Sequence, residues 1–245
     1  MGVPKENQKL KVMKNLLVVL VMAVSLNVTA QDNPRYLNVL AVNGLNMRSQ
    51  PDGNSRVLTK VAFGNRVEIL EKSKVELQLG WIKDSWYRVR FRGREGYIFG
   101  GYLSEMPAPI NLDKAKLLSN LVPIYCANSL QADGEIVHSK EFKRNGDTLH
   151  HSLLVFKNGI ELEIEKQGER RTSILLLRSN VKSTYVLLEA LLKGSEREEL
   201  LDDLRFVKDK SGELSRISSS DGAISIRKIA TDTVELKMTD YAINN

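Results

Sequence analysis

The chain is poor in cysteine, with one among its 245 residues. This residue, Cys126, excludes an internal disulfide framework and any zinc or iron–sulfur site built from several cysteines. Long apolar runs are also absent, because the most apolar stretch, over 16–26, is shorter than the roughly 18 residues that a transmembrane anchor needs. With 42% hydrophobic and 27% charged residues, the composition is that of a globular domain. Disorder, a collagen-like repeat and a multi-pass membrane protein are therefore excluded.

The sequence also lacks the short motifs of several large enzyme classes. It contains no Ser-centred nucleophile elbow, no phosphate-binding loop and no HExxH metal motif. Of the three histidines, His138 and His151 become diagonal neighbours on one face if Asn145-Gly146 forms a two-residue hairpin turn. Because no carboxylate or third ligand converges on that face, we interpret them as a structural pair. We expect no metal and no cofactor.

The first thirty residues have the pattern of a secretory signal peptide. Four lysines and one glutamate occupy 1–15, the apolar stretch follows, and Val28-Thr29-Ala30 supplies small residues before a cut. The alternative is an uncleaved short anchor. No cysteine follows the cut, so a lipoprotein anchor is not expected. We therefore expect an exported protein, periplasmic or extracellular in the cell envelope, with no stable membrane anchor after cleavage.

Charge is distributed unevenly along the chain. The net charge of +6 falls to about +3 when residues 1–30 are removed. Residues 31–109 hold 12 basic and 8 acidic side chains, whereas residues 110–245 hold 20 and 21. The cationic excess therefore lies in the first part of the mature chain. Export makes nucleic acid an improbable partner in spite of the basic isoelectric point.

Short alternating runs separated by turn residues predict a small barrel in the first region. Asn43-Gly44 and Gln50-Pro51-Asp52-Gly53 are turn signals, and 92–96 is another. The expected strands are Tyr36–Val42, Leu45–Arg48, Arg56–Ala62, Arg66–Leu70, Trp86–Phe91 and Tyr97–Phe99. Five or six short strands in about 70 residues imply a closed barrel, since closure removes vulnerable sheet edges.

A set of motif residues follows in order and at fixed spacing within residues 36–105: Leu45, Asn46, Arg48, Ser49, Pro51, Gly64, Trp86, Val89, Gly93, Gly96, Tyr97, Tyr102 and Leu103. They form a Leu-Asn-x-Arg-Ser-x-Pro opening, a mid-domain glycine, a Trp-x-x-Val strand, a Gly-x-x-Gly-aromatic turn and a closing Tyr-Leu. This pattern resembles that of the bacterial SH3 domain family, an SH3-like barrel. The chain departs from the pattern at Tyr97, where the family usually has Trp. It also has a longer segment before Trp86, which carries an extra aromatic residue, Trp81.

The resemblance implies a binding module for cell-wall peptides or for proline-containing or extended segments of partner proteins. On this basis the groove aromatics are Tyr87, Tyr97 and Tyr102, with Trp81 at the rim. Trp81 has two interpretations, a ligand anchor or a residue that packs down to pin the long loop. Trp86 and Tyr87 are successive strand residues and point to opposite faces, and we expect Trp86 to be the buried one.

Arginines are the second group of candidate binding residues. Arg48 either holds the first loop by donating to backbone carbonyls or binds a ligand carboxylate, and its place in the family motif favours the structural role. Arg88, Arg90, Arg92 and Arg94 occupy alternate positions, so those on the strand form a charged stripe along one face. The stripe either attracts carboxylate-rich peptides or phosphate-bearing polymers, or is an ordinary solvated face.

The second region has a recognisable layout but resembles no family. A Pro-containing linker leads to a helix over Leu112–Leu121, an antiparallel meander, two short helices and a final pair of strands. One short helix contains Tyr185, Leu188 and Leu192 and ends at Gly194, and the other begins with a Ser195/Glu198 capping box and carries Leu200, Leu201 and Leu204. The expected strands are Pro123–Ala127, Glu135–Phe142, Thr148–Phe156, Ile160–Lys166, Thr172–Arg178, Ala223–Ile229 and Thr233–Met238.

The expected fold is mainly β, an N-terminal SH3-like β-barrel followed by an antiparallel α+β domain. The expected parts are a signal peptide (1–30), the barrel (31–105), the linker (106–111) and the α+β domain of unknown function (112–245).

These observations predict an exported, non-catalytic binding or adaptor protein whose barrel binds a peptide-like ligand. That ligand is a cell-wall peptide, such as a peptidoglycan stem peptide, or an envelope partner protein. The alternative is a cell-wall hydrolase or amidase, or its accessory, with cryptic catalysis in residues 110–245. Cell-wall peptidases often pair this barrel with a Cys–His catalytic domain. The surroundings of Cys126 lack the Asp-Cys-Ser-Gly and Ser-x-Gly-Cys motifs of such enzymes, and a strand there offers no activating helix terminus or cation. We therefore expect Cys126 to be buried and no residue to be catalytic.

Overall fold

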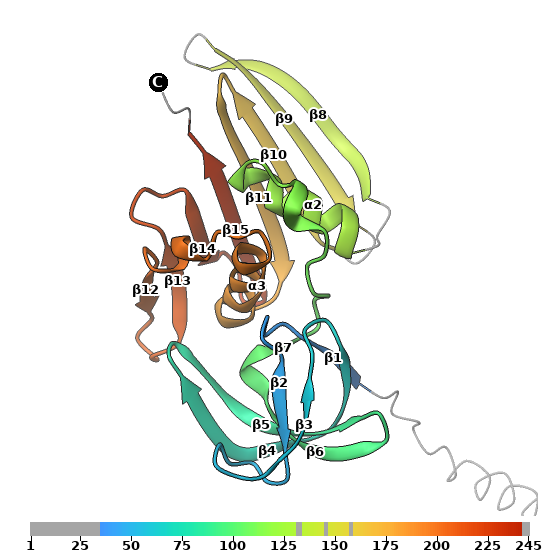
Figure 1. Ribbon diagram of the computed structural model, residues 1–245. Coiled ribbons are helices and arrows are strands. Elements are labelled where there is room, and N and C mark those ends of the chain that lie inside the picture. Colours follow the sequence, from blue (N-terminus) through green and yellow to red (C-terminus); the bar gives the residue numbers. More distant parts are fainter. Residues whose placement is uncertain (1–34, 131–133, 145–146, 157–158, 242–245) are drawn as a thin grey trace, which may run out of the picture. The chain divides into compact units, whose positions relative to one another are not determined.

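The computed structural model describes residues 35–130, 134–144, 147–156 and 159–241 (Figure 1). The described residues from Arg35 onward form one compact unit, built on two antiparallel sheets. The expected signal peptide lies outside the described residues, as do the turn residues Asn145, Gly146 and Asn158. None of the described helices is long and apolar enough to span a membrane.

The first sheet is the SH3-like barrel expected from the sequence. Its seven strands, in the order β3-β2-β6-β5-β4-β1-β7, curl into a half-barrel (Figure 1). The full closure expected from the sequence is wrong, because β3 and β7 do not pair and remain as edge strands. The strands are β1 (Arg35–Val39), β2 (Leu45–Arg48), β3 (Val57–Val61), β4 (Arg66–Leu79), β5 (Ile82–Phe91), β6 (Arg94–Phe99) and β7 (Leu103–Ser104). The segment before Trp86, which the sequence suggested was a long loop, is a long hairpin formed by β4 and β5.

The two faces of the hairpin β5–β6 belong to different cores. Val89 and Ile98 are fully buried in the barrel's own interior. Trp86 is 4% exposed, which agrees with its expected burial, but it packs with Phe99 in a larger cluster shared with the second sheet. Because neighbouring strand residues point to opposite faces, this Trp86 face is the outside of the barrel. It is buried by the second region.

The second sheet has eight strands in the order β12-β13-β14-β15-β11-β10-β9-β8. The strands are β8 (Gly134–Arg144), β9 (Asp147–Phe156), β10 (Glu161–Gln167), β11 (Arg170–Arg178), β12 (Arg205–Lys208), β13 (Leu214–Ser218), β14 (Ile224–Lys228) and β15 (Thr233–Asp240). The expected antiparallel meander is confirmed for β8 to β11. Strands β12 and β13 are not among the expected elements, since the sequence pattern predicts a helix through Leu204 and no regular structure between it and Ala223.

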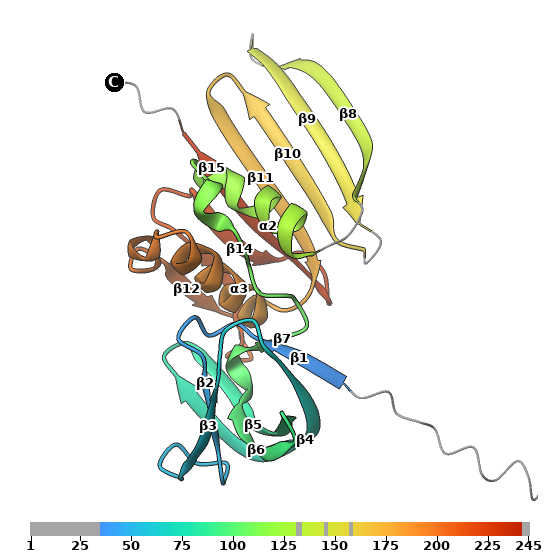
Figure 2. The same cartoon turned by 45° about the vertical axis from the view of Figure 1, so that its right-hand side comes forward.

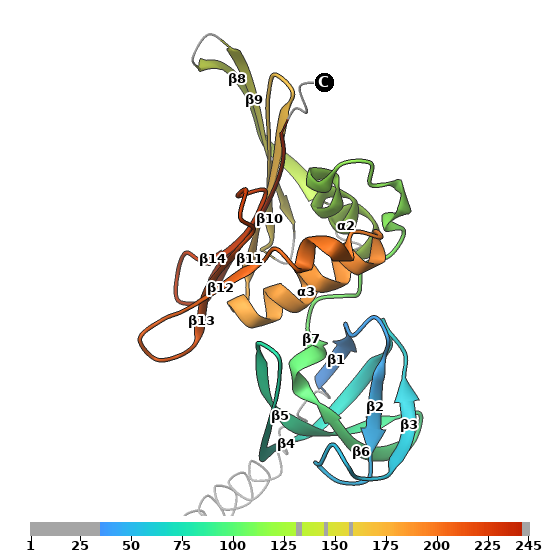
Figure 3. The same cartoon turned by 60° about the vertical axis from the view of Figure 1, so that its left-hand side comes forward.

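Helices α2 (Leu121–Ser129) and α3 (Val181–Gly194) cover one face of this sheet (Figures 2 and 3). Asn180 caps α3, because its side-chain oxygen accepts a hydrogen bond from the Ser183 N–H at 2.9 Å. Buried residues of both helices share one core with the inner side chains of the sheet and with barrel residues such as Trp86. The mainly β class, a barrel followed by an antiparallel α+β layer, is as predicted.

The expected strand at Pro123–Ala127 is wrong, because this segment is the middle of α2. Leu121, Tyr125 and Ser129 are buried at helical spacing, which so short an apolar run does not distinguish from a strand. Pro123 is tolerated because it lies in the first turn of the helix, where backbone N–H groups have no intrahelical acceptor.

The expected helix over Leu112–Leu121 is also wrong. Only two 3-10 turns form there, at Leu112–Lys114 and Leu118–Asn120. The Asp240 carboxylate, at the end of β15, accepts hydrogen bonds from the N–H groups of Leu118 and Ser119 at 2.9 and 2.8 Å. This long-range contact holds the chain in a conformation that local spacing does not predict.

The capping box predicted at Ser195/Glu198 does not form. Ser195 follows the last residue of α3, and its hydroxyl donates to the Leu192 carbonyl at 3.1 Å. The helix expected after it is a 3-10 turn, Glu198–Leu201, without a side-chain cap. Glu196 has a positive φ of 58°, a conformation that reverses the chain before a longer helix can start.

The linker segment lies packed against α2. Ala108 and Pro109 are buried, and the Tyr125 hydroxyl donates to the Pro107 carbonyl at 3.1 Å. The Ile110 N–H donates to the Ser129 hydroxyl at 3.1 Å. Prolines make this segment extended, and these contacts attach it to the second region.

Candidate ligand-binding cleft

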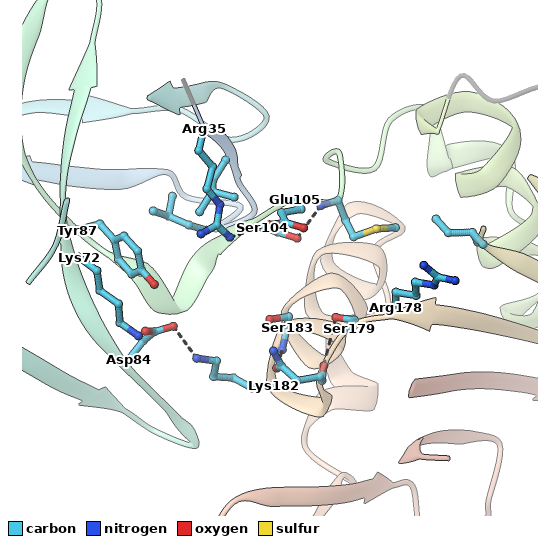
Figure 4. A pocket seen from close by; sticks show the side chains of 16 residues that line it. Arg35, Lys72, Asp84, Tyr87, Ser104, Glu105, Arg178, Ser179, Lys182 and Ser183 are labelled. Atoms are coloured by element: carbon cyan, nitrogen blue, oxygen red, sulfur yellow. Dashed lines mark hydrogen bonds and ion pairs between the residues drawn. The ribbon is translucent and has the colours of Figure 1, made fainter. Parts of the chain in front are cut away.

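A cleft of about 520 Å³ lies between the half-barrel and the start of α3 (Figure 4). Barrel residues form one wall, with Lys72 on β4 and Asp84 and Tyr87 on β5. The other wall contains Arg178 at the end of β11, Ser179 and Asn180 just before α3, and Lys182 and Ser183 in its first turn. A cleft of this size can hold a small ligand or a few residues of a peptide.

An ion pair connects the two walls. The Lys182 ammonium group lies 2.5 Å from the Asp84 carboxylate, and the two side chains are only 28% and 13% exposed. Lys182 also donates to the Lys83 carbonyl at 3.3 Å. A second pair, between Arg35 and Glu105 at 2.7 Å, lies at the solvent-exposed margin of the cleft. Both acidic residues of the cleft lining are therefore already paired.

Two cationic side chains of the lining have no carboxylate partner in the described part of the chain. The Lys72 ammonium group lies 5.8 Å from the centroid of the Tyr87 ring, a cation–π contact. The Arg178 guanidinium makes no hydrogen bond or ion pair with any described residue and is exposed. Since these two cations stand on opposite walls, the cleft favours a ligand that carries anionic or hydrogen-bond-accepting groups.

A second cavity, of about 470 Å³, adjoins the Asp84–Lys182 pair. It shares Lys72, Asp84 and Lys182 with the first cleft, and Trp81 lines it. The Asp84–Lys182 ion pair therefore lines both cavities. An extended peptide that occupied both cavities would pass over this pair.

Gly100 allows Tyr87 to occupy the cleft. A Cβ atom at this glycine would collide with the Tyr87 ring and would lie 2.9 Å from the Ser85 carbonyl oxygen. Gly100 begins a 3-10 turn, Gly100–Tyr102, that follows β6 directly. The Gly-Gly dipeptide before Tyr102 is the sequence signal for this close approach.

Residues 43–104 match the family model of the bacterial SH3 domain. The resemblance seen in the sequence is thereby confirmed for about a quarter of the chain. Lys72, Tyr87 and Gly100 of the barrel wall lie within the matched segment, whereas Arg178 and Lys182 lie outside it. No curated protein and no solved structure matches the chain. The match indicates a binding module.

The three tyrosines expected to form one groove, Tyr87, Tyr97 and Tyr102, do not lie together in the structure. Tyr87 lines the cleft, but Tyr97 and Tyr102 do not. Tyr97 is half-buried on β6, and Tyr102 packs edge-on against Phe99, with ring centroids 6.3 Å apart. Burial and the neighbouring Glu189 of α3 raise the pKa of Tyr102 to about 12. Tyr102 therefore joins the SH3 domain to α3.

Trp81 lies at the tip of the β4–β5 hairpin and contacts the second sheet. Its ring stacks on Phe206 of β12 with centroids 4.7 Å apart. This contact agrees with the interpretation that Trp81 packs down and fixes the hairpin in place. Trp81 nevertheless remains 50% exposed to solvent. The exposed part lines the second cavity, so the anchor interpretation stays a prediction.

The arginine stripe is neutralised over half its length. Arg88 pairs with Glu95 at 3.0 Å, and Arg90 pairs with Glu95 at 2.8 Å and Glu68 at 3.0 Å. Hydrogen bonds from Arg90 and then Arg88 lower the pKa of Glu95 below its ordinary value. Arg92 stacks over Phe91 and forms no ion pair with any residue that the structure describes.

Arg48 has the structural role expected from the family motif, because it hydrogen-bonds a backbone carbonyl. Its guanidinium donates to the Ser55 carbonyl at 2.6 Å, which closes the loop that follows β2. A backbone carbonyl acceptor of this kind agrees with the residue's place in the family motif.

The candidates for chemistry in the second region lie apart from the cleft. Cys126 lies on α2, is 1% exposed, and burial raises its thiol pKa to about 12. His138 and His151 have ring centroids 6.2 Å apart, and His151 lies 3.6 Å from Glu163. Among the described residues, no group of three or more His, Cys, Asp or Glu side chains could hold a metal ion.

Proposed function

We propose that this chain is an exported, non-catalytic binding protein of the cell envelope, and that its SH3 domain and second sheet hold a peptide-like ligand between them. The observation that carries the proposal is the position of Tyr87. This aromatic residue of the SH3 domain lines a cleft whose opposite wall, with Arg178, comes from the second region.

The chemistry of the cleft supports a peptide that carries carboxylates. Tyr87 offers a ring face and a hydroxyl, and Lys72 and Arg178, which pair with no described carboxylate, can each bind a carboxylate. The stem peptides of bacterial cell walls have free carboxylates, and so do acidic segments of envelope proteins. Both agree with the secretory pattern of residues 1–30, which supports export.

A sedimentation assay with purified cell-wall sacculi tests the proposal. The chain without residues 1–30 is incubated with sacculi, and both bound protein and released soluble fragments are measured. We expect binding without release. Arg178→Gln should weaken binding about ten-fold, the low end for a lost hydrogen bond to a charged group. Arg171→Gln, also exposed on β11 but outside the cleft lining, is the matched control and should bind like the wild type.

Tyr87 is tested in the same assay. Tyr87→Phe should weaken binding modestly and Tyr87→Ala more strongly, whereas Tyr36→Ala, at an exposed tyrosine of the same domain, should have no effect. Thermal unfolding of each variant separates lost contacts from lost folding.

Two results would overturn the proposal. Release of soluble fragments that Cys126→Ala abolishes would make the chain a thiol hydrolase. If sacculi are not bound, the proposal requires an envelope protein as ligand, and a pull-down from envelope extract should then recover a partner with the wild type and lose it with Tyr87→Ala. Failure to find such a Tyr87-dependent partner would exclude the cleft as a binding site.

A further inference from the structure

A separate cavity of about 370 Å³ opens on the SH3 domain and shares no lining residue with the cleft. Its walls come from three segments: the end of β3, the turn between β3 and β4, and the β5–β6 hairpin. The lining residues are Thr59, Lys60, Ala62, Asn65, Phe91, Arg92 and Arg94. Three of the seven are cationic, and none is acidic.

The three cations differ from the other arginines of the same hairpin. Arg88 and Arg90 are held by Glu68, Glu71 and Glu95. By contrast, Lys60, Arg92 and Arg94 form no ion pair in the part of the chain that the structure describes. The arginine stripe therefore divides into a neutralised half on the strand and a cationic half at the turn. The cationic half, together with Lys60 from β3, surrounds the cavity.

The backbone holds Arg92 at the cavity in an unfavourable conformation. Phe91 pairs with Arg94, so Arg92 and Gly93 are the two residues of a tight hairpin turn. Both have positive φ, 48° and 74°, as a type I′ turn requires. Asn, Asp or Gly normally occupies the first of these positions, because a longer side chain is crowded there. An arginine at this position retains a charged side chain at the expense of turn stability, a pattern found at functional sites.

We propose that this cavity binds an oxyanion group, a phosphate or a carboxylate, of an anionic ligand. Two guanidinium groups can each donate two hydrogen bonds to oxyanion oxygens, and Lys60 adds a third positive charge. The Phe91 ring supports Arg92, whose guanidinium carbon lies 5.1 Å from the ring centroid. The site is independent of the cleft and does not rest on the proposed function.

Isothermal titration of the chain lacking residues 1–30, at low ionic strength, tests the site with two probes. Tripolyphosphate represents phosphate and citrate represents carboxylate, so the comparison shows which oxyanion is preferred. The variant that replaces Lys60, Arg92 and Arg94 with Gln should lose at least ten-fold in affinity for the preferred probe. The matched control replaces Arg88 and Arg90 with Gln and should change affinity less than two-fold.

A single variant separates binding from folding. Arg92→Asn creates the preferred Asn-Gly turn, so we expect a higher unfolding temperature together with weaker anion binding. Two results would overturn the proposal: no measurable binding of either probe by the wild type, or an equal loss of affinity in the control variant, which would indicate only a diffuse attraction of anions to a basic domain.

Discussion

Trp81 and Phe206 stack face to face, with ring centroids 4.7 Å apart and ring planes 8° from parallel. Trp81 belongs to the tip of the β4–β5 hairpin, and Phe206 belongs to β12 of the second sheet. Tyr185 of α3 completes the contact, because its ring meets Phe206 edge-on at 5.3 Å. The three rings join a hairpin of the SH3 domain to an edge strand and a helix of the second region.

This stack predicts a measurable coupling between the two parts of the chain. In a double-mutant cycle of Trp81→Ala and Phe206→Ala, followed by urea unfolding, the coupling free energy should be about 1 kcal/mol, as for other aromatic pairs. A coupling near zero would show that the rings stack without stabilising the fold. Trp81→Ala should also leave binding to sacculi unchanged if the residue only pins the hairpin.

The Asp84–Lys182 pair should contribute more to stability than the Arg35–Glu105 pair. Its side chains are largely shielded from water, whereas those of Arg35 and Glu105 are 60% and 73% exposed. Lys182→Met leaves the Asp84 carboxylate without its partner, so we expect a loss of roughly 1–2 kcal/mol in unfolding free energy. Arg35→Met, the matched control, should cost less than about 0.5 kcal/mol. Equal losses in the two variants would mean that water reaches the Asp84–Lys182 pair as freely as the exposed Arg35–Glu105 pair.

Gly100→Ala should displace Tyr87 and thereby weaken ligand binding. The added Cβ would overlap the Tyr87 ring, so the ring or the 3-10 turn must move, at a cost of about 1–3 kcal/mol in stability. Gly53→Ala is the matched control, because nothing lies within 4 Å of its Cβ and its φ is not positive. Sedimentation with sacculi and thermal unfolding of both variants provide the measurements. Wild-type binding by the Gly100→Ala variant would remove Tyr87 from the binding site.

The parts of the fold that follow from local pattern were predictable from the sequence. Alternating strands between turn residues give the SH3-like sheet and the β8–β11 meander, and Gly194 does end α3. The failures occur where a distant contact decides the local structure. The chain near Leu118 adopts a 3-10 turn because Asp240, at the other end of the second region, binds its backbone N–H groups.

Only the barrel wall of the candidate cleft could be predicted from the sequence. Tyr87 was identified from the family pattern, which covers one wall. Arg178 and Lys182 come from a segment without a family pattern, and nothing in the sequence indicates that Lys182 meets Asp84. The same holds for Trp86, whose burial was predicted but whose partners in the second region were not.

Cys126 should be unreactive in the folded chain. Burial raises its thiol pKa to about 12, so on the order of one thiol in ten thousand is ionised at pH 8, and the group is also inaccessible. Iodoacetamide labelling followed by mass spectrometry should detect no modification until urea unfolds the protein. Cys126→Ala should keep full binding to sacculi. Rapid labelling of the native chain would revive the thiol hydrolase as an alternative.

Two tyrosines at the contact between the SH3 domain and α3 predict a loss of stability at alkaline pH. Burial, and then the neighbouring Glu189 carboxylate, raise the pKa of Tyr102 and of Tyr185 to about 12, above the ordinary value of 10. The folded state therefore favours the neutral phenols. Their contribution to stability is complete below pH 10 and is lost as the pH rises through 12.

Unfolding temperatures measured between pH 9 and 12 test this expectation. The wild type should lose stability over the upper two pH units, by on the order of 1 kcal/mol per tyrosine after allowance for solvent screening. A variant with Tyr102→Phe and Tyr185→Phe cannot ionise at these sites, so its stability should fall less steeply. Tyr36→Phe, at an exposed tyrosine of the same domain, controls for general alkaline effects and should follow the wild type. Parallel curves for all three proteins would mean that ionisation of Tyr102 and Tyr185 is not linked to unfolding.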